Sequence, residues 1–74
     1  MAPLDRITVH PGVMDGKPCI RGMRVTVSMI MKQLAAGQTA ESLLAEFPYL
    51  ELEDIRQSLR YAAILADERE VALG

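Results

Sequence analysis

The sequence predicts one mainly α-helical domain, with three helices after a small N-terminal β-hairpin arm. Residues 1–27 hold short β-branched runs broken by turn residues, and from residue 28 apolar residues recur at helical spacing. A chain of 74 residues is also too short for a two-domain enzyme with a deep cleft. We therefore expect a single domain over 1–74, divided into a β-arm (5–27), a three-helix core (28–67) and a mobile tail (68–74).

The arm is expected to contain brief strands joined by turns. Ile7–His10 alternates apolar and polar residues, as a half-buried strand does. Asp15-Gly16 predicts a hairpin turn, because glycine accepts the positive φ that such turns need. Residues 19–21 are expected to form a returning strand that breaks at Gly22, and residues 24–27 another. Strands this short need helices or a second chain to support them.

Cap and stop residues mark the first two helices. Either Thr26 or Ser28 caps the first helix, and Gly37 follows its last turn. Thr39 caps a second, shorter helix, and Pro48 ends it because proline cannot continue helical hydrogen bonding.

The third helix is predicted to be the longest, from Glu51 to Asp67. Its apolar residues step by three and four positions and are expected to face the core: Leu52, Ile55, Leu59, Ala62 and Ala66. Burial of that stripe leaves four side chains on or near the outer surface: Arg56, Gln57, Arg60 and Tyr61.

Helix, short turn and helix is the layout of a helix-turn-helix DNA reader. Arg56 and Arg60 would share one face of the third helix, and Gln57 would add a side chain able to read a base edge. Against this, three carboxylates at the start of that helix, Glu51, Glu53 and Asp54, would repel phosphates. The alternative is an ordinary exposed face, on which the arginines pair with neighbouring carboxylates.

The charges divide along the chain. Residues 1–32 hold five basic and two acidic residues, whereas residues 33–74 hold three basic and eight acidic ones. This asymmetry suits contact with a polyanion or a complementary subunit, or else describes two solvated faces. Lys17, Arg21 and Arg24 form the basic cluster of the arm. They are candidates for contact with an acidic partner or with phosphates, unless they only keep a strand edge soluble.

The residues provide no basis for catalysis or for a cofactor or metal site. His10 is the single histidine, and Cys19 is the single cysteine and is expected to be a buried structural thiol. We therefore predict that the protein is not an enzyme. With no possible internal disulfide, no signal-like N-terminus and no membrane-length apolar run, we expect a soluble cytoplasmic protein that binds no membrane.

The composition favours self-association. Half of the residues are hydrophobic, yet a core of this size is only marginally stable. We expect a homodimer. Four methionines, Met14, Met23, Met29 and Met31, either fill the core or line the dimer surface.

Five ordered blocks lie between Ile7 and Ala63. They are Ile7-x-x-x-Pro11, Gly16-Lys17-Pro18-x-Ile20-x-Gly22-x-Arg24-Val25, Leu34-x-x-Gly37, Phe47-Pro48-x-Leu50-x-x-x-Asp54-Ile55 and Leu59-x-Tyr61-Ala62-Ala63. Over roughly residues 5 to 66, this series resembles the bacterial domain of unknown function 433 family, small proteins described as VapB-like antitoxins. Met23 stands where that family usually has Thr, and Glu51 where it tends to place a Thr or Ser helix cap.

The resemblance implies a homeodomain-like three-helix core and the antitoxin role of a type II toxin–antitoxin pair. The implied partners are a PIN-like ribonuclease toxin, a second copy of the chain and operator DNA. For neutralisation we expect Lys17, Arg21 or Arg24 to pair with the metal-binding carboxylates of the toxin and block them. The alternatives are a stand-alone helix-turn-helix regulator that uses Arg56, Gln57, Arg60 and Tyr61, or a structural adaptor that binds no DNA.

Overall fold

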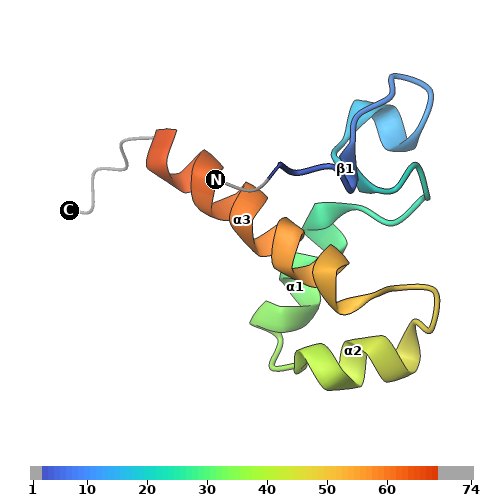
Figure 1. Ribbon diagram of the computed structural model, residues 1–74, viewed down its shortest axis with the longest axis vertical. Coiled ribbons are helices and arrows are strands. Elements are labelled where there is room, and N and C mark those ends of the chain that lie inside the picture. The colour runs from blue at the N-terminus through green and yellow to red at the C-terminus, as the bar shows by residue number, and fades with distance from the viewer. Residues whose placement is uncertain (1–2, 69–74) are drawn as a thin grey trace.

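The computed structural model describes residues 3–68 and confirms the predicted mainly α fold with a small hairpin (Figure 1). The elements in chain order are β1 (Ile7–Thr8), the short turn η1 (Met14–Gly16), β2 (Cys19–Ile20), α1 (Val27–Ala35), α2 (Ala40–Glu46) and α3 (Leu52–Glu68). Most of the predicted mobile tail, residues 69–74, lies outside the described residues.

The two strands of the arm pair antiparallel, with Ile7 opposite Ile20, and both are shorter than predicted. Arg21 and Gly22, with φ values of 47° and 72°, form the tight turn after β2, and Met23 N donates to Ile20 O at 2.8 Å. Two successive positive φ values define a type I′ turn, in which glycine is strain-free.

The strand expected over residues 24–27 is absent. Only an isolated bridge between Cys19 and Thr26 forms there, and Val27 is already the first residue of α1. The physical reason is the cap: the Thr26 hydroxyl accepts a hydrogen bond from Met29 N at 3.0 Å, which starts the helix. Thr26, not Ser28, is therefore the cap of α1.

The predicted start of α2 is confirmed. Thr39 and Ser42 form a reciprocal capping box, with both hydrogen bonds at 3.0 Å. Phe47 ends the helix, directly before Pro48. Residues 47–51 then turn the chain into α3, so that α2 and α3 have the helix-turn-helix layout.

The core lies where the three helices meet the hairpin. Its most deeply buried aliphatic residues are at most 2% exposed and come from every part of the fold: Ile20, Ile30, Leu43 and Ile55. Met23, Met29 and Met31 pack against this cluster. Helix α3 passes beside α1, and its C-terminal half extends beyond the rest of the fold (Figure 1).

The predicted buried face of α3 is only partly correct: Ile55 is buried and Ala62 is half-buried, but the other three residues of the stripe are exposed. Leu52 and Leu59 are 42% and 48% exposed, and Ala66 is also exposed. The buried side of the first turns of α3 carries Ile55 together with three polar residues: Asp54, Gln57 and Ser58. Each of these has hydrogen-bond partners inside the protein, which removes most of the cost of burying it.

Candidate functional site

Asp54 accepts four hydrogen bonds through its side chain, more than any other side chain among the described residues. Its side chain is fully buried at the start of α3, and its carboxylate accepts hydrogen bonds from two arginines of the arm. Arg21 donates from Nε and Nη2 at 3.1 and 2.9 Å, and Arg6 donates from Nη1 at 3.1 Å. The amide N–H of Glu51 adds a fourth hydrogen bond at 2.8 Å.

These contacts determine the protonation state of Asp54. Burial alone would raise the pKa of its carboxyl group, because a charge is less stable away from water. The hydrogen bonds from Arg21, from the Glu51 amide and from Arg6 outweigh burial and bring the pKa below its ordinary value. Asp54 is therefore an ionised structural group that ties the arm to α3.

The same contacts explain how α3 begins. The carboxylate of Asp54 returns to the N–H of Glu51, and Asp54 N donates to Glu51 O at 3.0 Å. The Glu51 side chain does not take part in this capping contact and instead forms an ion pair with Arg6. The missing Thr or Ser cap at this position is thus compensated by Asp54, three residues into the helix.

Gln57 is a second clamp between the arm and α3. Its side chain is 2% exposed, donates to Asp5 at 2.7 Å and accepts from Arg6 N at 2.8 Å. The prediction that Gln57 lies on the outer surface is therefore wrong, because the N-terminal residues cover it. A base edge cannot reach this amide in the folded chain.

The other three residues predicted to read DNA do not share one open face. Arg56 is exposed and forms no ion pair with any described residue. Arg60 is partly buried and pairs with Glu53 at 3.3 Å, as the ordinary-face alternative expected. Tyr61 is half-buried and packs against the core. Of the four candidates, Arg56 alone is left fully available to solvent.

The basic cluster of the arm also separates into two roles. Arg21 is bound to Asp54 and additionally donates from Nη2 to Tyr49 O at 2.7 Å. Lys17 and Arg24 are exposed, and within residues 3–68 neither forms an ion pair. Of the three residues in this cluster, only Lys17 and Arg24 can therefore be reached by an acidic partner without disturbing the fold.

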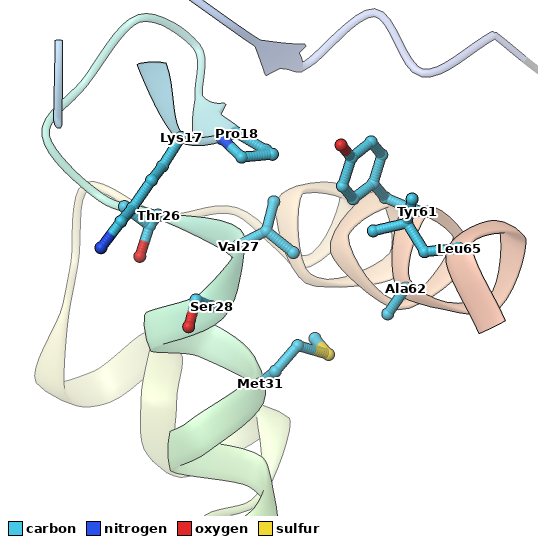
Figure 2. Close-up of a pocket in the computed structure, with 9 residues that line it drawn as sticks. All are labelled: Lys17, Pro18, Thr26, Val27, Ser28, Met31, Tyr61, Ala62 and Leu65. Atoms are coloured by element: carbon cyan, nitrogen blue, oxygen red, sulfur yellow. The ribbon is translucent and has the colours of Figure 1, made fainter. Parts of the chain in front are cut away.

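An apolar groove of about 310 Å³ opens between the N-terminal half of α1 and the C-terminal half of α3. Figure 2 shows Val27 and Met31 on the α1 side and Leu65 on the α3 side, with Lys17 extended beside Thr26 at one edge. The full lining is Lys17, Pro18, Thr26, Val27, Ser28, Met31, Tyr61, Ala62 and Leu65.

This groove could not be found from the sequence, because its two helical walls come from segments at least 30 residues apart. The contact between Arg6 and Asp54 likewise could not be predicted from the sequence. The sequence does contain one indication of the α3 wall, a second series of positions at helical spacing: 55, 58, 62 and 65. Hydropathy alone does not identify this series as apolar, because position 58 is Ser.

The remaining reactive side chains are not grouped. Cys19 is buried, as predicted, and its thiol donates to Lys17 O at 3.2 Å. His10 is exposed in the loop after β1. Over residues 3–68 no cluster of three His, Cys, Asp or Glu side chains is placed to hold a metal ion. In the same range, no helix combines the length and apolarity that a membrane crossing requires.

Three comparisons place the fold among known proteins. The family described as "Protein of unknown function (DUF433)" matches residues 7–62. The "Uncharacterized protein y4eO" of Sinorhizobium fredii (strain NBRC 101917 / NGR234) is 38% identical over 56 residues. That match covers 76% of this chain but 25% of the relative, so this chain spans about a quarter of the relative's length.

A solved structure is also similar. The crystal structure of a DUF433 member protein from Anabaena variabilis ATCC 29413 matches with a TM-score of 0.79 and 28% sequence identity. The match covers 85% of this chain and 62% of that one. Most of the fold described above thus recurs in a protein of the same family description.

Proposed function

This chain belongs to the DUF433 family, and on that premise we propose that it acts as an antitoxin that binds and neutralises a PIN-like ribonuclease toxin. The proposal joins the antitoxin role implied by the family resemblance to a surface suited to a partner protein. Direct occlusion is the proposed mechanism: cations of the arm pair with the metal-binding carboxylates of the ribonuclease and prevent them from holding their metal ion.

The observation that carries the proposal is the position of Lys17. Its ammonium group is exposed, has no ion pair within residues 3–68 and lies at the edge of the apolar groove. An apolar surface with a charge at its rim is a common form of protein interface. The groove therefore suits an apolar segment of the toxin that carries a carboxylate, which would pair with Lys17 while Val27 and Met31 bury the apolar part.

Arg24 is the second cation available for this role, because it is exposed and unpaired among the described residues. Arg21 is reassigned. Taking its guanidinium for a toxin carboxylate would leave the buried Asp54 short of two hydrogen bonds, at a cost that an intermolecular pair would have to offset. The proposed toxin contact therefore uses Lys17 and Arg24.

Purification from the native host tests this proposal. A tagged copy of the chain is isolated after nuclease treatment, and proteins that co-elute are identified by mass and assayed for ribonuclease activity. We expect one small ribonuclease in stoichiometric amount, inactive in the complex and active once separated. A chain that elutes alone, or a partner whose ribonuclease activity is unchanged by the complex, would overturn the proposal.

DNA binding is the second candidate, favoured by the helix-turn-helix layout of α2 and α3 and by the exposed Arg56. Two nearby carboxylates disfavour DNA binding, since Glu51 and Glu53 lie at the end of α3 that would enter the major groove of the DNA and would repel its phosphates. A duplex titration at several salt concentrations tests it. A specific DNA-binding chain shows a steep loss of affinity with salt, and an Arg56→Ala, Arg60→Ala double variant loses binding.

A further inference from the structure

The outward face of α3 is apolar although no described part of the chain covers it. Leu52 and Leu59 are 42% and 48% exposed, and Ala63 and Ala66 are exposed on the same side of the helix. We infer that this face, called the outer stripe, packs against the outer stripe of a second copy of the chain, with the two α3 helices antiparallel and centred on Leu59.

The spacing within the outer stripe supports helix pairing. Leu52, Leu59 and Ala66 are each seven residues apart, the repeat that keeps one seam of a helix facing a partner helix. The C-terminal half of α3 adds to this, since Arg60 is its only charged residue between Leu59 and Ala66. A helix segment that is apolar on nearly all sides is stable when it is covered on more than one side.

The order of large and small residues favours a second copy over a different partner. Leu52 and Ala66 lie at equal distances before and after Leu59. In an antiparallel pair centred on Leu59, each Leu52 therefore meets the small Ala66 of the other copy, and the two Leu59 side chains meet at the axis. A two-fold interface requires a surface that complements itself in this way.

The charges beside the outer stripe favour the antiparallel direction. Long helical side chains lean toward the N-terminus of their helix, so Arg56 of one copy leans toward the end of the partner helix that carries Asp67. About five residues of helical rise, roughly 7 Å, separate the two positions, which the arginine side chain can span. A parallel pair would instead bring together the Glu51 and Glu53 side chains of both copies.

Cysteine cross-linking tests the pairing. In the proposed dimer the two side chains at position 59 meet at the axis, so Leu59→Cys is expected to form a disulfide dimer under copper-phenanthroline and air. The matched control is Leu65→Cys, because Leu65 is 42% exposed but belongs to the groove side of α3. Cys19 is present in both variants and is buried, so the unmodified chain gives the background.

The expected result is cross-linking of Leu59→Cys about 1,000-fold faster than of Leu65→Cys, since proximity replaces a micromolar with a millimolar thiol concentration. Equal rates for the two variants would overturn the inference. Sedimentation without oxidant gives a second readout: the unmodified chain sediments as a dimer, and Leu59→Glu as a monomer that circular dichroism shows to be folded. A dimer that persists in Leu59→Glu, or an unmodified chain that is monomeric at all concentrations, would contradict it.

A charge exchange separates this surface from unspecific apolar association. Arg56→Asp and Asp67→Arg are each expected to weaken the dimer about tenfold, and the two changes together to restore it. If the double variant instead weakens the dimer by the sum of the two single effects on the dimerisation free energy, the antiparallel arrangement is contradicted. Neither measurement involves the toxin, so failure of the antitoxin proposal leaves the result of this test intact.

Discussion

Asp54 and Arg21 lie 33 residues apart in the chain, and the carboxylate of one accepts two hydrogen bonds from the guanidinium of the other, at 3.1 and 2.9 Å. This pair fastens the turn after β2 to the first turn of α3. With Arg6 and Gln57 it makes the arm part of the folded body. Lys17 and Arg24, the cations of the arm that form no ion pair within residues 3–68, are thereby held on a positioned surface.

Removing the Asp54 carboxylate is expected to destabilise the protein. Asp54→Ala should lower the free energy of unfolding by about 3 kcal/mol, the low end for breaking a buried ion pair, because water can still reach the two arginines. Urea denaturation followed by circular dichroism measures the change. Glu53→Ala, one position earlier on the partly exposed side, is the control and should change stability by less than about 1 kcal/mol.

The contribution of Asp54 should also depend on pH. Although burial opposes ionisation, the hydrogen bonds from Arg21, Glu51 and Arg6 hold the folded-state pKa below the ordinary value. The ionised carboxylate therefore stabilises the fold fully above the unfolded pKa of about 3.9, and this contribution is lost as the pH falls through the lower folded-state pKa.

Asp54→Asn measures this dependence, because asparagine imitates the protonated side chain. The difference in unfolding free energy between the original chain and Asp54→Asn should be largest near about pH 7 and should shrink below about pH 4. A difference that stays constant from neutral to acid pH would show that the charge of Asp54 does not contribute.

Thr26 is expected to matter as the cap of α1. Thr26→Ala removes the acceptor for Met29 N and should destabilise the protein by about 1 kcal/mol. Ser28 is exposed and is the matched control, so Ser28→Ala should have little effect. Thermal unfolding of both variants checks this prediction. An equal loss of stability in the two variants would contradict the assignment of Thr26 as the cap.

Gln57 and Arg56 are neighbours in sequence with opposite expected behaviour. Gln57→Ala leaves Asp5 and the N–H of Arg6 without their partner and should lower stability by about 1–2 kcal/mol. Arg56→Ala should leave the monomer fold unchanged, because Arg56 is exposed and unpaired within residues 3–68. Chemical denaturation distinguishes the two when both changes are made in the Leu59→Glu background, which the dimer inference expects to be monomeric.

The helix boundaries could be predicted from the sequence because local chemistry determines them. Thr39 and Ser42 cap α2 within a single turn, and Pro48 cannot continue it. Local chemistry also explains why the predicted strands were too long or too many. The β-branched residues within 24–27 favour a strand locally, but Thr26 caps α1, which begins at Val27.

The buried face of α3 could not be predicted, because long-range partners determine it. Hydropathy assigns Asp54 and Gln57 to solvent, and only the arginines and Asp5 of the arm make their burial favourable. The many alanines and leucines of α3 fit two helical stripes, and the spacing alone does not choose between them. Arg21 was predicted to contact a partner protein for the same reason, because the sequence does not show that it binds Asp54 of its own chain.

Inhibition of the ribonuclease by charge-reversal variants tests the central claim most directly. Lys17→Glu and Arg24→Glu are compared with Lys32→Glu, a reversal at an exposed lysine of α1 outside the groove. Each is titrated against the ribonuclease that co-purifies with the chain. The account predicts inhibition weakened at least about tenfold by the first two changes and unchanged by the third. Equal inhibition by all three variants would contradict it.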